Sequence, residues 1–439
     1  MNAQPDRRRF GLASLTATVV ANMIGAGIFT TTGFALYDLG SPERVLLAWV
    51  IGGAIAILGT LCYGALARHL QISGGEYLFL SRTMSPRVGF LAGWISLCAG
   101  FSGAIAFAAE TLQAYIQPYL PDAFPADVVG TLLILALAVL HAFRLNAGAL
   151  LQNIAVTFKV LLLIGLAIAG WLLLPETTAP AEIAGGNTTM GTDAVSPALK
   201  PWEWGSFAMV LMWVSLSYSG WNAAVYVAGE AKNAQRNIPR AMLIGTLLVT
   251  TLYLALNYVF VYAAPISELA GREDIAAAAT AALGSSMLEG IVRFGLALAM
   301  LTSISSMVMI GPRIYAQMAD DGVFPKFFSF RGNTPSRSIF LQAALAIALL
   351  WGSGLRQQLT NLGWLLGVCT ALSVVGLMML RRDLGKKSVP IPGYPWVPLL
   401  FLTAVTSLSV MMAWHNGADL IPAVAVLLTG WLASYYRRG

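Results

Sequence analysis

The stretch that most constrains this chain is an apolar run, residues 15–37, that is interrupted at its centre by glycine. Its sequence is LTATVVANMIGAGIFTTTGFALY, with Gly25 and Gly27 in the middle. About 20 apolar residues span the roughly 30 Å hydrocarbon core of a bilayer, and backbone groups released inside lipid must bond to protein, water or a ligand. The run therefore predicts a membrane helix with a break at its centre, a position that suits a polar ligand.

Composition indicates that this break belongs to a polytopic membrane protein. Of 439 residues, 57 % are hydrophobic and 10 % charged, with a mean hydropathy of +0.72, whereas soluble domains carry roughly 25 % charged residues. We expect one all-α transmembrane domain over residues 1–439. Apolar runs predict twelve transmembrane helices, at residues 12–37, 45–67, 88–116, 127–143, 153–174, 205–229, 241–264, 287–318, 337–353, 359–380, 396–414 and 419–436.

Basic residues are distributed unevenly among the predicted loops. Most of the 26 lysines and arginines lie at the two termini and in one alternate set of loops, which the positive-inside rule assigns to the cytoplasm. We therefore expect a cell-membrane protein with both termini cytoplasmic, and we attribute the net charge of +6 to topology rather than to nucleic-acid binding. Cys62, Cys98 and Cys369 have no metal or disulfide spacing, and no metal or cofactor is predicted.

A second interruption occurs five spans after the first, at residues 218–221 (YSGW). Spans 1 and 6 cross in opposite directions, and two broken helices in this relation are typical of inverted-repeat transporters with a site at the bilayer midplane. We expect a five-plus-five core with discontinuous helices 1 and 6, repeats at about 12–174 and 205–380, and two additional helices at about 396–436. The alternative is that the glycines of the two breaks only allow close helix packing.

The helix ends at the two breaks carry opposite partial charges. The half-helix that begins near Ala26 and Gly27 presents free N–H groups, which suit a carboxylate. The turn that ends at Met23 and Ile24, and the one that ends at Ser219, present carbonyl oxygens, which suit an ammonium group. A small molecule that carries both groups side by side is an α-amino acid, so the sequence predicts secondary active amino acid transport.

Four motifs in the chain resemble those of the amino acid-polyamine-organocation superfamily, in particular its L-type amino acid transporter branch. They are MIGAGIF at 23–29, SGGEY at 73–77, YSGWNAAVYVAGEAKNAQRNIPRAM at 218–242 and GPRIYAQMADDGVFPKFF at 311–328. The resemblance implies a leucine-transporter-like inverted-repeat fold. It also implies sodium-independent exchange or proton-linked uptake of neutral L-amino acids by alternating access.

The resemblance also implies a substrate site. It places Gly25, Ala26 and Gly27 on the carboxylate-binding backbone, and Ile24 and Ser219 on the ammonium-binding carbonyls. The second break supplies the remaining candidates, which are Leu216, Tyr218, Gly220, Trp221 and Asn222.

Two departures from the family pattern modify this picture. Leu216 stands where related proteins often have an aromatic gate, so we expect the occlusion of the site to be either looser or differently built. The loop at 117–126 contains no cysteine, whereas animal L-type proteins have one there that joins a partner subunit. We therefore expect no disulfide-linked heavy chain, and we expect a monomer.

One lysine, Lys159, lies inside the predicted fifth span. A charged side chain within a membrane is costly and indicates a functional position by default. In related families a lysine at this place occupies the position of the sodium ion of sodium-coupled relatives. The resemblance thus implies that Lys159 replaces the ion, with the Gly25 region and Ser303 or Ser306 as its contacts. The alternative is that its ammonium group extends to the cytoplasmic interface.

Other functions are less well supported by the sequence. An intramembrane enzyme would need a recognisable nucleophile, base or metal motif, and a channel would not need two matched breaks. A proton-coupled symporter, or an exporter of amino acids or of other organic ammonium compounds such as polyamines, remains open as an alternative. No carboxylate of the kind a polyamine needs lies within either break. Glu110, near the outer end of span 3, suits either a proton path or an interfacial carboxylate.

Overall fold

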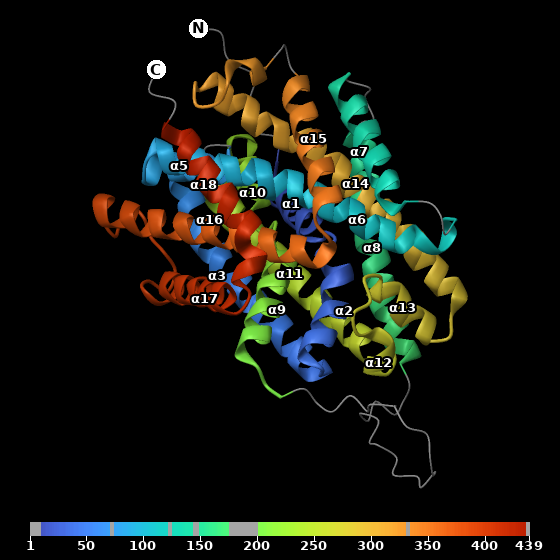
Figure 1. The fold of residues 1–439 in the computed structure, drawn as a ribbon. Helices are drawn as coiled ribbons and strands as arrows, with labels where there is room; N and C mark the ends of the chain where they lie inside the picture. Colours follow the sequence, from blue (N-terminus) through green and yellow to red (C-terminus); the bar gives the residue numbers. More distant parts are fainter. Residues whose placement is uncertain are drawn as a thin grey trace, which may run out of the picture.

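The computed structural model describes residues 10–70, 74–121, 125–143, 149–174, 201–330 and 334–435, and Figure 1 shows their arrangement. All regular elements in these ranges are helices, apart from one isolated bridge between Phe10 and Ala231. The basic clusters at the two termini, which entered the topology prediction, lie outside the described residues.

The helices follow one another along the chain without a sheet between them. The first half forms α1 (Leu12–Met23), α2 (Gly27–Leu39), α3 (Pro42–His69), α4 (Gly75–Thr83), α5 (Pro86–Ile95), a π-helical segment (Ser96–Gly103), α6 (Ala104–Ile116), α7 (Ala126–Ala142) and α8 (Ala149–Leu173). The second half forms α9 (Trp204–Ser217), α10 (Ala223–Tyr226), α11 (Ala234–Tyr262), α12 (Ile266–Leu269), α13 (Ile275–Ala282), α14 (Ser286–Asp320), α15 (Ser336–Gly352), α16 (Leu355–Leu384), α17 (Trp396–His415) and α18 (Ile421–Tyr435).

The lengths and composition of these helices fit a multi-pass membrane protein. Seven helices are long and apolar enough to cross a bilayer, and α1 with α2 forms an eighth candidate that is bent by 41° at a short break. Four shorter apolar helices, α7, α8, α9 and α15, lie within other predicted spans. The all-helical fold is thereby confirmed, while the count of twelve spans and the inverted repeat stay predictions.

Several long helices begin where the sequence carries a capping serine. The hydroxyl oxygens of Ser41, Ser85 and Ser285 accept hydrogen bonds from backbone N–H groups three residues later, at 3.2 to 3.3 Å. Pro42 and Pro86 follow the first two of these serines, in the position where the missing N–H of proline costs nothing. The starts of α3, α5 and α14 are therefore determined by local sequence.

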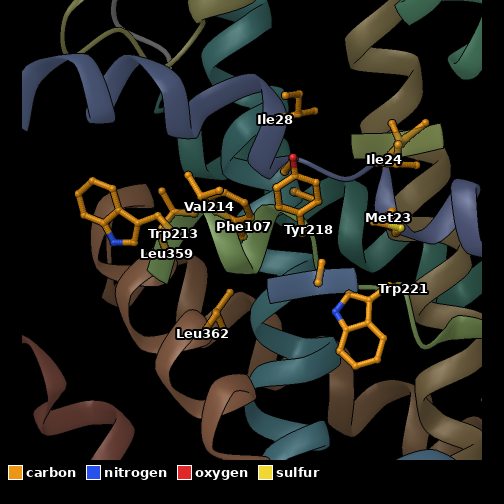
Figure 2. Packing of buried hydrophobic residues seen from close by; sticks show 14 of the residues in the cluster. Met23, Ile24, Ile28, Phe107, Trp213, Val214, Tyr218, Trp221, Leu359 and Leu362 are labelled. Atoms are coloured by element: carbon orange, nitrogen blue, oxygen red, sulfur yellow. The ribbon is translucent and has the colours of Figure 1, made fainter. Parts of the chain in front are cut away.

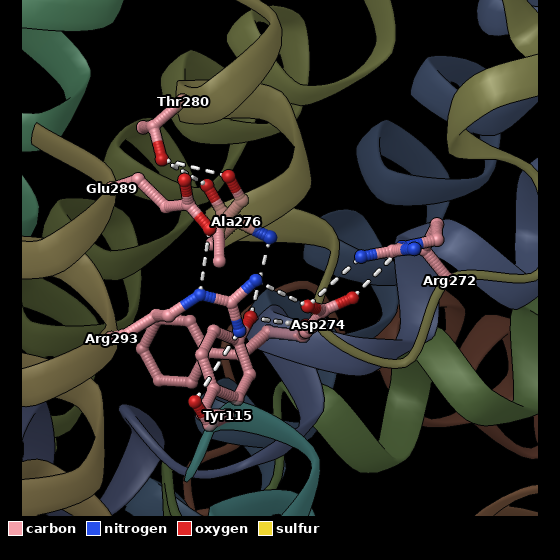
Figure 3. Close-up of polar contacts among 9 residues, drawn as sticks. Tyr115, Arg272, Asp274, Ala276, Thr280, Glu289 and Arg293 are labelled. Carbon is pink, nitrogen blue, oxygen red and sulfur yellow. Dashed lines mark hydrogen bonds and ion pairs between the residues drawn. The ribbon is translucent and has the colours of Figure 1, made fainter. Parts of the chain in front are cut away.

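A buried ion-pair network holds α13 against α14 (Figure 3). Arg293 on α14 donates to a carboxylate oxygen of Asp274 at 2.9 Å and to Glu289 at 2.8 Å. Arg272 donates to the second oxygen of Asp274 at 2.9 Å, and Arg293 also donates to the carbonyl of Tyr115 at 3.3 Å. Because opening a buried, fully bonded ion pair is costly, α13 is held firmly at this end of the bundle.

The same network reaches the first turn of α2. The hydroxyl of Tyr115 donates to the carbonyl of Phe29 at 2.9 Å and accepts from the N–H of Ala276 at 3.2 Å. Further along α2, the N–H of Gly271 donates to the carbonyl of Gly33 at 2.7 Å. The segment that contains α12 and α13 therefore covers the end of the bundle to which α2 leads (Figure 1).

Candidate substrate site

The first break separates α1 from α2 by three non-helical residues. The N–H of Gly25 turns back to the carbonyl of Met23 at 2.9 Å, and the N–H of Phe29 bonds to the carbonyl of Ala26 at 3.0 Å. Among the backbone hydrogen bonds of the described residues, none uses the N–H groups of Ala26, Gly27 or Ile28. The amino end of α2 thus presents unpaired donors and a positive partial charge within the core.

The second break separates α9 from α10 by five residues. The N–H of Ser219 bonds to the carbonyl of Leu216 at 2.8 Å, and that of Ala223 bonds to Gly220 at 2.9 Å. Between these turns Gly220 has a φ of +98°, a conformation that side chains other than glycine rarely adopt. The chain therefore leaves the helical path at the residues where the sequence predicts an interruption.

The two breaks are in direct contact. A methyl group on Gly220 would lie 2.6 Å from the carbonyl oxygen of Asn22 and 3.0 Å from the nitrogen of Met23. One on Gly27 would lie 2.8 Å from the Cα of Ser217. The hydroxyls of Thr31 and Ser217 share a hydrogen bond of 2.9 Å beside this contact. These glycines thus serve close packing, as the alternative proposed, and this packing is what brings the two breaks together.

Three buried aromatic rings hold both breaks from one side. Trp49 on α3, Tyr218 in the second break and Tyr253 on α11 lie with ring centroids 5.2 to 5.6 Å apart. The Tyr218 hydroxyl donates to the carbonyl of Trp49 at 3.1 Å, and the Tyr253 hydroxyl donates to the carbonyl of Met23 at 2.7 Å. Figure 2 shows Tyr218 in the buried core that also contains Met23 and Ile24.

These contacts correct one prediction about the first break. The carbonyl of Met23 is not free for an ammonium group, because it accepts hydrogen bonds from Tyr253 and from Gly25. Sequence reasoning missed Tyr253, since a tyrosine within an apolar span has the same pattern as any core aromatic residue. Of the two carbonyls predicted at this break, only that of Ile24 remains as a candidate.

Lys159 is buried rather than extended to an interface. It is 2 % exposed, and its ammonium group donates to the hydroxyl of Ser303 on α14 at 3.1 Å and to the carbonyl of Ala21 at 3.4 Å. Ala21 lies in the last turn of α1, where the negative end of the helix dipole favours a cation. The predicted contact with Ser303 is present, whereas Ser306 makes no hydrogen bond to Lys159 among the described residues. This burial disagrees with the interface alternative.

Side chains of the second break line a small cavity. It has a volume of about 60 Å³ and lies between the break and helices α3, α9, α16 and α17. None of the described residues that line it is charged, and most are apolar. The lining includes Leu216 from the end of α9, Ser219 and Trp221 from the break, Gly52 from α3, Gly363 and Gly367 from α16, and Phe401 from α17.

Asn222 and Glu110 have structural partners instead. The amide of Asn222 donates to the buried carboxylate of Glu76 on α4, a residue that was quoted in a motif but not proposed for the site. Glu110 accepts from the backbone N–H of Leu355 at 2.9 Å and from Gln358 at 2.8 Å, so it caps the positive end of α16. Within the described ranges, no three histidine, cysteine or acidic side chains gather as a metal site would require.

Comparison with known proteins relates the chain to one family and to several of its transporters. A family model described as "Amino acid permease" matches residues 10–433. The human large neutral amino acids transporter small subunit 2 is 25 % identical over 97 % of this chain and 79 % of its own length. The mouse Asc-type amino acid transporter 1 is 24 % identical over 97 % and 80 %. The serine/threonine exchanger SteT of Bacillus subtilis (strain 168) is 24 % identical over 90 % and 88 %.

Proposed function

The chain belongs to the amino acid permease family, and from this premise we propose that it exchanges neutral L-amino acids across the cell membrane without sodium. The family assignment confirms the resemblance carried by the four motifs, and it makes the protein a transporter rather than an enzyme. The relatives named as neutral amino acid transporters or as an exchanger support the choice of substrate class.

The observation that carries this proposal is the contact between the two helix breaks. The unpaired N–H groups at Ala26, Gly27 and Ile28 suit the substrate carboxylate, because they combine hydrogen-bond donors with the positive end of a helix dipole. The carbonyls of Ile24 and Ser219 are the candidates for the ammonium group. No charged side chain is needed for either end of a zwitterion.

We assign the substrate side chain to the cavity behind the second break. Its lining carries no charge among the described residues, which favours a neutral substrate. Its volume of about 60 Å³ is well below the roughly 300–1,000 Å³ of pockets that bind drug-sized ligands. The cavity as it stands therefore favours small side chains, such as those of alanine, serine and threonine, over large ones.

We assign the role that a coupling ion has in sodium-dependent transporters to the buried ammonium group of Lys159. Lys159 bridges the last turn of α1 and Ser303 on α14, and we propose that its fixed charge takes the place of a sodium ion, with Ser306 at the edge of the same position. We also propose that the chain forms a five-plus-five inverted repeat with both termini cytoplasmic, and that it transports by alternating access. Since residues 117–126 lack a cysteine, we propose that the chain works as a monomer without a disulfide-linked partner.

Counterflow in proteoliposomes tests this function directly. Liposomes loaded with an unlabelled neutral amino acid should accumulate labelled alanine, serine or threonine at the same rate with and without sodium. A rate that requires an inward proton gradient, with no counterflow in its absence, would favour the symport alternative. Absence of counterflow for every common amino acid would contradict the proposal.

Enlarging Gly367 is expected to narrow the range of substrates. A methyl group there would lie 3.5 Å from Val405 and 3.8 Å from Met212, which is ordinary contact, so Gly367→Ala should be tolerated. Gly367→Leu would fill the cavity, and one excess methylene in an apolar pocket costs about 1–3 kcal/mol. Transport of leucine relative to alanine should fall about tenfold in Gly367→Leu. An unchanged ratio in competition assays would show that the side chain lies elsewhere.

Removing the hydroxyl of Tyr253 is expected to slow exchange about fivefold. The substitution Tyr253→Phe keeps the ring in the aromatic cluster but deletes the hydrogen bond to Met23, which is worth about 1 kcal/mol. The carbonyl of Met23 in the first break then loses one of the hydrogen bonds that fix its orientation. The matched control is Tyr258→Phe on the same helix, where the ring packs against Trp171 and Tyr262. Equal rates in the two variants would show that the Met23 contact is not important.

A further inference from the structure

A buried carboxylate lies directly against the second break. Glu76, in the first turn of α4, is 6 % exposed. Its two oxygens accept hydrogen bonds from the side-chain amide of Asn222, from the hydroxyl of Tyr226 and, at 3.3 Å, from the hydroxyl of Tyr63. Among the described residues, no lysine or arginine forms an ion pair with it. Within the described ranges, its side-chain partners are thus three neutral donors.

The donors come from parts of the chain that are far apart in sequence. Tyr63 belongs to α3, Asn222 to the second break and Tyr226 to α10, the short helix that continues the break. The carboxyl group of Glu76 therefore links α4 to α3, to the second break and to α10 through three hydrogen bonds. The half-helix after the second break is therefore tied to α4.

The packing around this link is equally close. Gly75 has a φ of +60°, and a methyl group on it would lie 2.1 Å from the ring of Tyr226. The ring of Trp221 lies edge-on to Tyr63, with centroids 4.7 Å apart. On the other side of α4, the hydroxyl of Tyr77 donates to Asp321, beyond the end of α14, at 2.8 Å. Together these contacts close the bundle at α4.

This closure lies at the opposite end of the bundle from α13. Helix α3 begins at Pro42, just after the end of α2, which contacts α13. Its 28 residues run to His69, six positions before the start of α4 at Gly75. A helix of that length spans about 40 Å at 1.5 Å per residue. The site between the breaks is consequently covered at one end by α13 and at the other by α4.

We propose that Glu76 is a positioning residue that holds the second break closed on the α4 side and must release Asn222 and Tyr226 each time the site opens there. Opening at this end separates α10 from α4, and the hydrogen bonds of the carboxylate are the bonds that this motion breaks. The role in a transport cycle rests on the proposed function, whereas the latch itself is measured without any substrate.

A native cysteine reports on this latch. Cys369 lies on α16, which packs against α4, and it is 4 % exposed. In a Cys62→Ser, Cys98→Ser background it is the single cysteine of the chain. Its rate of modification by N-ethylmaleimide, followed by mass, therefore measures how often the α4 end opens.

Glu76→Gln is expected to raise the labelling rate of Cys369 about tenfold in purified protein. The glutamine side chain keeps one acceptor oxygen but places an NH₂ donor where the other carboxylate oxygen lay, so one of the two donors, Asn222 or Tyr226, loses its acceptor. Tyr226→Phe removes one donor and should raise the rate by a smaller factor, and Glu76→Asp should restore much of the slow labelling. The matched control is Glu230→Gln, because Glu230 is exposed and carries the same charge.

Transport by the same variants separates the latch from a merely stabilising contact. Glu76→Gln should lower turnover while the KM measured from the α13 side stays unchanged, because that face of the site is not altered. Labelling at the wild-type rate in both Glu76→Gln and Tyr226→Phe would overturn the proposal. Equal acceleration in Glu230→Gln would also overturn it. If no variant transports any amino acid but labelling follows the expected order, the proposed function fails and the latch stands.

Discussion

Exchange by the Gly220→Ala variant should fall at least about 100-fold in proteoliposome counterflow. Gly220 has a φ of +98°, and forcing another residue into such a conformation costs about 1–3 kcal/mol. The new methyl group would also meet the Asn22 carbonyl at 2.6 Å, and overpacking of this kind costs typically about 1–3 kcal/mol. Since about 1.4 kcal/mol corresponds to a factor of ten, the combined cost is large enough to remove most activity.

The cost falls on the substrate site because the atoms that resist the methyl group are backbone atoms. Asn22 and Met23 belong to the last turn of α1, so the clash has no side chain that turns away. The variant either pushes the two breaks apart or straightens the second one. In both cases the carboxylate and ammonium positions no longer lie at the spacing that one amino acid needs.

Gly284→Ala is the matched control for this prediction. Gly284 also has a positive φ, +80°, but nothing lies within 4 Å of the position that its methyl group would take. It therefore carries the conformational strain without the contact, and its exchange rate should remain within about twofold of wild type. Melting temperatures of both detergent-solubilised variants separate loss of fold from loss of function. Full exchange by Gly220→Ala would show that contact between the breaks is not required.

The positions of the two breaks were predictable because their causes are local. A glycine pair at the centre of an apolar run, and a Gly-Trp pair five spans later, weaken the helix locally. Since α3 stays helical through Gly52 and Gly53, the match between the two stretches was also needed to single them out. The capping serines before α3, α5 and α14 act in the same local way. The Lys159 contact with Ser303 followed from the family resemblance, which carried a position between two distant helices that no local pattern provides.

Tertiary contacts explain what the sequence did not indicate. Asn222 reads as a site residue from its motif, but its amide is committed to Glu76, and that pairing depends on how α4 folds back onto the break. Tyr253 has the same difficulty, since its hydroxyl matters only because α11 turns that face toward α1. The π-helical turn at Ser96–Gly103 has no signature in hydrophobic periodicity, because one extra residue per turn changes the pattern too little.

Loss of the Lys159 ammonium group should lower exchange about 100-fold. In Lys159→Ala the hydroxyl of Ser303 and the carbonyl of Ala21 lose their shared donor, which leaves α1 unconnected to α14 at this point. A hydrogen bond from a charged group contributes about 1.5–3 kcal/mol, and a cation at a partly buried helix C-terminus up to about 2 kcal/mol. A loss of about 3 kcal/mol corresponds to about 100-fold in rate, measured by counterflow of labelled serine or alanine.

Two further variants, Ser303→Ala and Lys232→Ala, distinguish the loss of this buried contact from the loss of any positive charge. Ser303→Ala removes one partner and keeps the charge, so we expect a smaller reduction, about tenfold. Lys232 is exposed, and Lys232→Ala removes the same charge from the surface, so its exchange should match wild type. Addition of sodium should not restore Lys159→Ala, because the Ser303 hydroxyl and the Ala21 carbonyl supply two oxygen ligands, whereas a hard cation takes about six. The ammonium group bonds to the last turn of α1, so its removal acts on the helix whose end forms the first break. Wild-type kinetics in Lys159→Ala would show that α1 needs no fixed charge to keep its position.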